Sequence, residues 1–196
     1  MILENQSLPL EVLGDQKKLK GHCFSKLSQL WKRTKLTKHR KIQVFQAVTS
    51  SRLLYGLSSA WLNIREQRKF DGFQAGCLRR ILGIRPSFIS HVSNQKVLEQ
   101  AKQTPYTHQL LKQQLLLYGK VARAPDDDPL RILTFCPGSL RPAASRYVRR
   151  VGRPKSEWAT KLYDHALRMT GGIQRLDATI SCTTAWTHHV LDYCKV

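Results

Sequence analysis

Hydrophobic and polar residues alternate along this chain with the period of an α-helix, most clearly between Arg65 and Ile84. When this stretch is projected as a helix, the apolar and basic residues separate onto opposite sides. The apolar side holds Phe70, Phe73, Cys77, Leu78, Ile81, Leu82 and Ile84, and the basic arc holds Arg65, Arg68, Lys69, Arg79 and Arg80. Gly72 and Gly76 lie in the middle of the basic arc. Such a helix has one face for a protein core and one for either solvent or a polyanion.

Similar periodicity predicts further helices along most of the chain. The predicted helices cover residues 15 to about 35, 37 to about 62, 65–83, 93 to about 101, 107 to about 124, 156–169 and 183–193. Residues 1–14 suit a single short strand, but no other strand is evident to pair with it. Residues 135–155 are rich in Pro, Gly and Arg and indicate a basic linker. The fold class is therefore predicted to be mainly α: a helical bundle with a short N-terminal strand, this linker and a small C-terminal helical piece.

The net charge of the chain is unusually positive. The sequence has 33 Lys and Arg residues against 13 Asp and Glu, which gives a formal net charge of +20 at pH 7. Residues 15–85 hold 17 of the basic and 3 of the acidic residues, so 14 of the 20 net charges lie there. A nucleic acid is the first partner to consider for such a chain, and an anionic membrane surface is the second. Lys38, Arg40 and Lys41 also crowd the start of one predicted helix, where a bound phosphate would relieve their conflict with the helix dipole.

The cysteines and the termini bear on the compartment. The five cysteines are scattered and form no CxxC pair, which favours free thiols in a reducing environment. The sequence has neither the N-terminal pattern of a secretory signal nor an apolar run long enough to span a membrane. We therefore expect an intracellular protein, nuclear or cytoplasmic, without a membrane partner.

Several short motifs occur in an order that is typical of one family. They are Leu30-Trp31, Leu54-Tyr55-Gly56, the run Cys77 to Ile84, Val92-Ser93-Asn94, Tyr118-Gly119, Arg123 to Asp127, Gly152-Arg153-Pro154-Lys155 and Ala185-Trp186. Over roughly residues 12–190 the chain resembles the region downstream of the polymerase palm in non-LTR (LINE-type) retrotransposon reverse transcriptases, a family of RNA-directed DNA polymerases. The resemblance implies a helical thumb and a C-terminal extension that hold template RNA and primer DNA.

This resemblance divides the chain into four parts. Residues 1–14 would be the remnant of a preceding palm, 15–134 a thumb-like domain, 135–155 the basic linker and 156–196 a C-terminal helical segment. The paired Asp residues of the family's palm are missing from the sequence, so the chain is expected not to be an enzyme by itself, and a separate palm-containing chain is a candidate partner. The family also usually has basic residues where this chain has Ala75 and Gly76, which thins the basic arc.

Phosphate neutralisation by basic side chains is the expected mechanism, with RNA or DNA as partner. The predicted nucleic-acid-binding residues are Lys17, Lys18, Lys20, Lys32, Arg33, Lys35, Arg65, Arg68, Lys69, Arg79 and Arg80, with Arg149, Arg150, Arg153 and Lys155 as a second clamp. Gly72 and Gly76 suit either a close approach of a nucleic-acid backbone or helix packing. The aromatic residues Trp31, Trp61, Phe70 and Phe73 are expected in the core, and Tyr147 is the candidate for base stacking.

Other chemistry is less well supported by the sequence. Cys182, His188, His189 and Cys194 suggest a zinc knuckle, but the opening CxxC is missing, so neither a metal nor another cofactor is expected. Asp126-Asp127-Asp128 lies between two prolines, which suits a turn better than a metal site. Gly152-Arg153-Pro154 resembles half of an AT-hook, with Val151 in place of the first core Arg. Two alternative functions stay open: a decayed retroelement product without activity, and a DNA-tethering protein that uses the basic linker.

Overall fold

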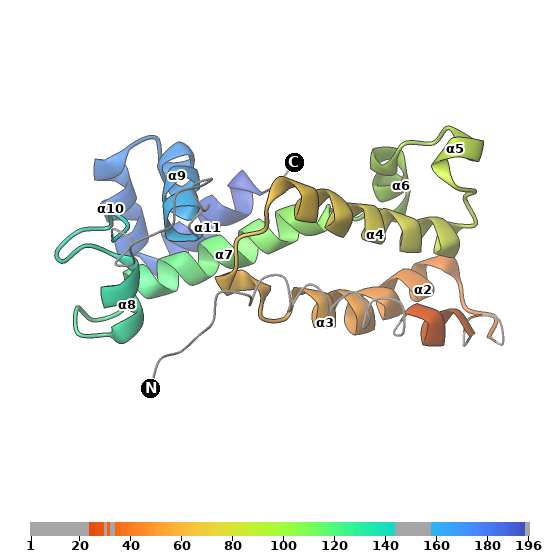
Figure 1. Ribbon diagram of the computed structural model, residues 1–196, viewed down its shortest axis with the longest axis horizontal. Coiled ribbons are helices and arrows are strands. Elements are labelled where there is room, and N and C mark those ends of the chain that lie inside the picture. The colour runs from red at the N-terminus through yellow and green to blue at the C-terminus, as the bar shows by residue number, and fades with distance from the viewer. Residues whose placement is uncertain (1–23, 30, 32–33, 144–157, 195–196) are drawn as a thin grey trace, which may run out of the picture. The chain divides into compact units, whose positions relative to one another are not determined.

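The described part of the chain is mainly helical, which confirms the predicted fold class (Figure 1). The computed structural model describes residues 24–29, 31, 34–143 and 158–194. No β-strand occurs among these residues, and the predicted strand in 1–14 lies outside them. Of the helix predicted from Asp15, residues 24–29 and 31 are described and are helical, whereas residues 34 and 35 are described and lie outside any helix.

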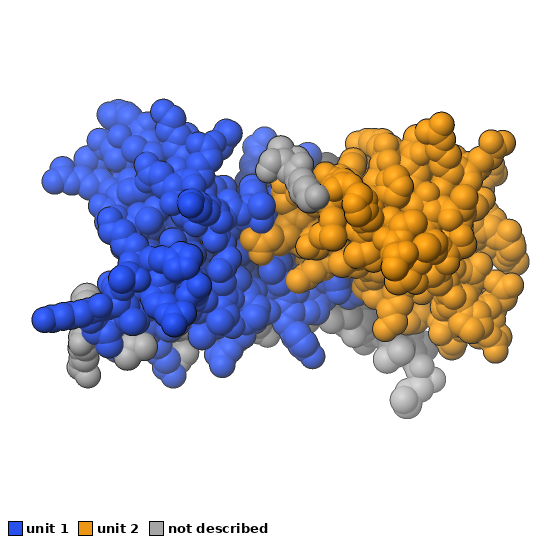
Figure 2. Space-filling view, turned by 180° about the vertical axis from the view of Figure 1, so that it is seen from behind, with its two compact units in different colours: residues 1–107 blue, residues 108–196 orange. Residues whose placement is uncertain are grey.

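The chain forms two compact units (Figure 2). Unit 1 ends at Thr107 and unit 2 begins at His108. This division differs from the predicted end of the first domain at residue 134, because residues 108–143 pack with the C-terminal helices.

The described elements of unit 1 run from α2 to α6. They are α2 (Lys38–Phe45), the π-helical segment η1 (Gln46–Ser50), α3 (Ser51–Leu54), the 3-10 segment η2 (Leu57–Ser59), α4 (Ile64–Leu82), α5 (Ser87–Ser90) and α6 (Asn94–Ala101). The helix predicted over 37–62 begins as expected, because the Thr37 side chain accepts a hydrogen bond from the backbone N–H of Arg40. It ends early at Leu54, because Tyr55 turns to ψ 128° and Gly56 takes the left-handed conformation at φ 73°.

The π-helical segment η1 joins α2 and α3 into one helical run with a wider turn in its middle. Thr49 and Ser50 of this turn are buried, unlike most polar residues of the unit. The hydroxyls of Ser50 and Tyr106 form a hydrogen bond of 2.5 Å. The wider turn therefore brings a hydroxyl into the core, where it pairs with a buried phenol.

Helix α4 has the ends that the sequence predicts. The Asn63 side chain accepts a hydrogen bond from the backbone N–H of Glu66, and the Glu66 carboxylate accepts one from the backbone N–H of Asn63, at 3.0 and 2.8 Å. This capping box satisfies two amides that would otherwise lack partners. At the other end Gly83 takes a left-handed conformation at φ 78°, which terminates the helix.

The core of unit 1 forms around aromatic rings on three elements. The ring of Tyr106 lies 6.5 Å from that of Phe45 and 5.2 Å from that of Phe70. The buried Gln74 of α4 donates a hydrogen bond to the Thr104 carbonyl oxygen and accepts one from the backbone N–H of Tyr106. Gln74 thus ties α4 to the segment that begins α7 (Tyr106–Ala122).

The described residues of unit 2 form the remainder of α7 and four further helices. These are α8 (Pro129–Thr134), α9 (Trp158–Thr170), α10 (Ile173–Ser181) and α11 (Thr183–Tyr193). Neither α8 nor α10 is among the helices predicted from the sequence. For α8 the missed signal is Asp128, whose side chain accepts hydrogen bonds from the backbone N–H groups of Leu130 and Arg131, followed by Pro129 in the first turn. Gly171 and Gly172, both with positive φ, separate α9 from α10, and the predicted helix 183–193 corresponds to α11.

The first part of the predicted linker is folded. Phe135 is buried and forms an isolated β-bridge with Pro142. The backbone N–H of Cys136 donates to the Arg141 carbonyl oxygen, and that of Ala143 donates to the Thr134 carbonyl oxygen, both at 2.9 Å. Residues 135–143 therefore belong to unit 2, and residues 144–157 lie outside the described chain.

The core of unit 2 forms around Trp186, whose indole ring lies against Gly119. The fully buried Trp186 of α11 donates a hydrogen bond from Nε1 to the Leu115 carbonyl oxygen of α7, at 3.0 Å. A Cβ atom built on Gly119 would overlap the Trp186 indole ring. Tyr118 contacts this ring and that of Phe135, with centroids 6.2 and 5.2 Å away. The pairs Tyr118-Gly119 and Ala185-Trp186 are thus parts of one packing arrangement.

Substitution of Gly119 by Ala should lower the free energy of unfolding by about 1–3 kcal/mol, because the added methyl group overpacks the site under Trp186. Urea denaturation followed by circular dichroism measures the change. Gly138→Ala is an informative contrast, since nothing described lies near that position and only its φ of +66° opposes a side chain. A Gly119→Ala protein as stable as the wild type would contradict the packing described here.

Candidate nucleic-acid interface

The exposed face of α4 carries four basic side chains around a bare centre. Arg65, Arg68, Lys69 and Arg80 are all exposed, and Gly72 and Gly76 between them are exposed as well. Apart from neighbouring residues and backbone of α4 itself, no described atom lies within 4 Å of a Cβ built at either glycine. Packing of described helices therefore does not account for these two glycines, and the backbone of α4 is open to an approaching ligand along this face. We call these six residues the α4 face.

Arg79 does not belong to the α4 face, which corrects the predicted set. Its side chain is only 7% exposed. One guanidinium nitrogen, Nη1, donates to the carbonyl oxygen of Arg85 and the hydroxyl of Ser90, and Nη2 donates to the Val92 carbonyl oxygen and to Asn94 Oδ1. The helical projection places Arg79 in the basic arc, but the segment 85–94 folds back over that part of α4. Arg79 is therefore a structural residue and cannot contact a phosphate in this conformation.

Ala75 also lies off the α4 face, since it is 1% exposed. The expectation that both Ala75 and Gly76 thin the basic arc is thus corrected for Ala75. A long basic side chain at that position would have to enter the core of unit 1. Only Gly76 leaves the exposed surface without a side chain.

Arg80 is positioned by an aromatic ring. Its guanidinium lies 5.5 Å from the centroid of the Phe24 ring, which is itself buried. Such a cation–π contact favours one orientation of the long side chain while leaving its charge exposed. The C-terminal end of the α4 face therefore presents a cation with reduced conformational freedom.

The other predicted binding residues are mostly outside the described chain. Lys35 is described and exposed. The predictions for Lys17, Lys18, Lys20, Lys32, Arg33, Arg149, Arg150, Arg153 and Lys155 fall on residues that the structure does not describe. The same holds for the AT-hook-like motif and for Tyr147, so the second clamp stays a prediction.

The segment held by Arg79 adds two exposed side chains that the sequence analysis overlooks. Arg85 is exposed just beyond α4, and Phe88 of α5 is 77% exposed. Arg85 comes two residues after the end of the helix at Gly83, next to the basic arc. Its position in the sequence is therefore enough to suggest it as a further exposed basic residue. The exposure of Phe88 had no such signal, because an isolated aromatic residue usually enters the core. Trp31 and Phe70 are buried as expected, and Trp61 and Phe73 are half-buried.

The Asp126–Asp128 segment serves the fold. Asp126 forms a 2.8 Å ion pair with Arg131, and Asp128 caps α8. Two of the three carboxylates thus have structural partners. In the described parts of the chain, no group of three or more His, Cys, Asp and Glu residues is placed to hold a metal ion.

The residues of the suggested zinc knuckle have separate surroundings. His188 Nδ1 lies 2.9 Å from Asp192 Oδ2, one turn along α11. Cys182 lies at the N-terminus of α11, where hydrogen bonds with the Thr184 side chain and with the backbone of Ala185 and Thr184 lower the pKa of its thiol. Cys194 is half-buried, and this burial raises the pKa of its thiol. The structure does not assemble these side chains into a site.

None of the described helices is both long and apolar enough to cross a membrane. Comparisons with models of known protein families, with curated proteins and with solved structures find no match to this chain. The features of this chain that bear on its function are therefore the α4 face and the sequence motifs.

Replacement of Arg79 by Met should lower the free energy of unfolding by about 2–4 kcal/mol, because the acceptors of segment 85–94 would lose a charged donor. Thermal unfolding followed by circular dichroism measures the loss. Arg80→Met is the matched control and should cost less than about 1 kcal/mol, since it removes one cation–π contact. Equal effects of the two substitutions would contradict the different roles assigned to these neighbours.

Substitution of Gly72 or Gly76 by Ala should each raise the free energy of unfolding by about 0.5–1 kcal/mol. Both glycines lie in the interior of α4 with helical backbone and open space around them, so a methyl group improves helix propensity without a clash. Chemical denaturation of each variant gives the change. A loss of stability would show that another part of the chain covers this face.

Proposed function

We propose that this chain binds RNA or DNA through the α4 face, and that it acts as a binding segment, not as a catalyst by itself. The observation that carries the proposal is the combination of four exposed cations with an exposed glycine backbone at their centre. A merely solvated face needs no such gap, because helix formers stabilise an exposed helix better than glycine does.

The four cations of the α4 face have no described acidic partner. Neither Arg131–Asp126 nor His188–Asp192, the ion pairs described above, involves them. Arg65 lies in the first turn of α4, where a positive charge opposes the helix dipole. The acid of that turn, Glu66, is engaged in the capping box. These charges thus add repulsion to the folded state, and a polyanion would remove it.

The spacing of the cations suits a nucleic-acid strand. Arg68 and Arg80 are twelve positions apart on α4, which corresponds to about 18 Å along a helix axis. This distance spans about five base-pair steps of a duplex at 3.4 Å each. Arg68 and Arg80 can therefore contact phosphates at different base-pair steps of a duplex, while the glycines leave room for the nucleic-acid backbone between them.

The resemblance to LINE-type reverse transcriptases supports the same role. In that family the corresponding region is a thumb that holds template and primer, and the run from Cys77 to Ile84 is among the motifs that carry the resemblance. Within this run, Arg79 is buried and supports the fold, and Arg80 is exposed and belongs to the α4 face. The same motif therefore contributes to the fold and to the proposed binding.

Binding to a fluorescent RNA–DNA hybrid should fall steeply with salt, with a slope of log affinity against log salt of roughly −5 to −7 if about 6–8 phosphates are neutralised. The triple variant Arg65→Ala/Arg68→Ala/Lys69→Ala should reduce the magnitude of this slope by about 2–3, because each lost phosphate contact contributes about one. Fluorescence anisotropy at several salt concentrations measures both slopes.

The matched control is Lys96→Ala/Lys120→Ala/Arg175→Ala, which removes the same charge from exposed positions elsewhere. Its slope should stay close to that of the wild type. A slope near zero for the wild type would reject nucleic-acid binding by phosphate contacts. Equal slopes for the two triple variants would reject the α4 face as the binding surface.

A further inference from the structure

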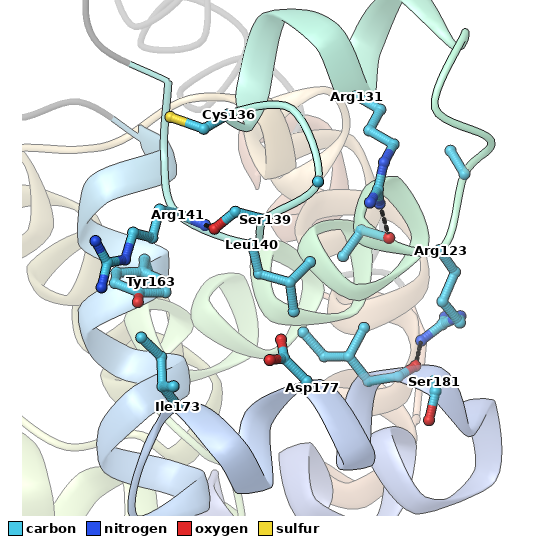
Figure 3. A pocket seen from close by; sticks show the side chains of 14 residues that line it. Arg123, Arg131, Cys136, Ser139, Leu140, Arg141, Tyr163, Ile173, Asp177 and Ser181 are labelled. Carbon is cyan, nitrogen blue, oxygen red and sulfur yellow. Dashed lines mark hydrogen bonds between the residues drawn. The ribbon is translucent and has the colours of Figure 1, made fainter.

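Unit 2 contains a pocket of about 1080 Å³ that the proposed function does not use (Figure 3). Its walls come from the end of α7, from α8, from the folded segment 136–141, and from α9 and α10. Three arginines, Arg123, Arg131 and Arg141, line it together with a single carboxylate, Asp177. The lining therefore has an excess of positive charge.

Two of these arginines are fixed by the fold and keep unused donors. Arg123 donates one hydrogen bond from Nη1 to the Ile180 carbonyl oxygen, at 3.1 Å. Arg131 donates from Nε to Asp126 and from Nη1 to the Ala122 carbonyl oxygen. Because a guanidinium has five N–H groups, both side chains can donate further bonds without leaving these positions.

Arg141 lies across the pocket from the other two, beside Tyr163 (Figure 3). The hydroxyl of Ser139 accepts a hydrogen bond from the backbone N–H of Arg141, which orders the start of this side chain. Its guanidinium has no hydrogen-bond or ion-pair partner among the described residues, and the residue is exposed. Arg141 is therefore the arginine of this pocket that the fold does not use.

The remaining wall is part apolar and part polar. Leu140, Ile173 and the ring of Tyr163 provide apolar surface, and Asp177 and Ser181 provide hydrogen-bonding oxygens. In Figure 3 Asp177 lies between Arg141 and Arg123 on α10. A bare inorganic anion would use only the arginines, and the carboxylate would repel it. A ligand that fits the whole lining has an anionic group, a flat or apolar body and a hydrogen-bond donor.

We propose that this pocket binds a mononucleotide unit, either a free nucleotide or the phosphorylated terminal nucleotide of a strand. Its phosphate lies against the guanidinium of Arg141, which has no described partner, since guanidinium groups match phosphate geometry. The base lies against Tyr163 and Ile173, and Asp177 accepts a hydrogen bond from an amino or ribose hydroxyl group. This site lies within unit 2 and does not depend on the α4 face, which belongs to unit 1.

Isothermal titration of the full-length chain with AMP, adenosine and inorganic phosphate tests this site. AMP should bind, and adenosine and phosphate should each bind at least tenfold more weakly. Arg141→Ala should weaken AMP binding at least tenfold, while Arg175→Ala, an exposed arginine of α10 outside the pocket lining, should leave it unchanged. Asp177→Asn should weaken AMP binding, because a carboxylate acceptor is lost, and should leave phosphate binding unchanged or stronger, because a negative charge is removed. Circular dichroism melting verifies that each variant is folded. Arg141→Ala should melt like the wild type, because Arg141 has no described side-chain partner to lose.

Failure of AMP to bind at millimolar concentration, or equal affinities of wild type and Arg141→Ala, would overturn the proposal. Phosphate binding as tight as AMP binding would also overturn it, since the base would then contribute nothing.

A competition experiment in the Arg65→Ala/Arg68→Ala/Lys69→Ala variant shows whether the bound nucleotide is free or is the end of a strand. Displacement of AMP by a 5′-phosphorylated oligonucleotide, but not by the unphosphorylated one, assigns the site to a strand end, and lack of displacement assigns it to a free nucleotide. AMP binding by this variant also separates the site from the function proposed for the α4 face.

Discussion

A buried guanidinium without a carboxylate partner holds one end of unit 1 together. Arg79 leaves α4 close to its C-terminus and donates hydrogen bonds to oxygen atoms of four residues between Arg85 and Asn94. Removal of a charge from water is costly, and only a full set of acceptors offsets that cost. The segment that contains α5 therefore has little freedom to move away from α4 while Arg79 stays buried.

Other polar side chains of α4 act in the same way farther along the helix. Gln74 bonds the backbone at Thr104 and Tyr106, and Asp71 accepts hydrogen bonds from the backbone N–H and the hydroxyl of Thr107. Both chain segments that follow α4 in unit 1 are thus fastened to it by side chains of its buried side. The exposed side gains from this arrangement, because a surface on a fixed helix loses less conformational entropy when it binds a ligand.

The sequence predicted well those features that depend on neighbouring residues. The limits of α4 follow from Asn63, Glu66 and Gly83, and each of these acts locally. The role of Arg79 was not predictable from helical periodicity, because that periodicity places it beside Arg80 in the basic arc. Its burial results from a segment that folds back over the helix, and such a return is a tertiary event. Ala75 was misplaced for the same kind of reason, since α4 packs against both α2 and α6 and has more than one buried side.

The candidate site in unit 2 was less accessible to prediction. Residues 135–143 show little periodicity, and their structure depends on the burial of Phe135 and on a few backbone hydrogen bonds. The arginines of the pocket follow α7, lie on α8 and lie in segment 135–143, and the opposite wall with Tyr163 and Asp177 comes from α9 and α10, so the pocket forms only when these elements have packed. The sequence shows the Tyr118-Gly119 motif but does not explain why a glycine is needed there. The explanation is the close contact with the Trp186 ring, which lies 67 residues later in the chain.

The π-helical turn between α2 and α3 gives this part of the chain one residue more than a regular helix would need. A π turn holds one residue more than an α-helical turn, but both turns complete about one rotation. The helices on either side therefore keep nearly the same relative facing as in an uninterrupted α-helix, and Ile42 and Phe45 stay buried. Loss of one residue from 46–50 could close the turn into a regular helix without rotating α2 relative to α3. The extra residue thus matters less for the facing of the flanking helices than for the hydroxyl that Ser50 brings into the core.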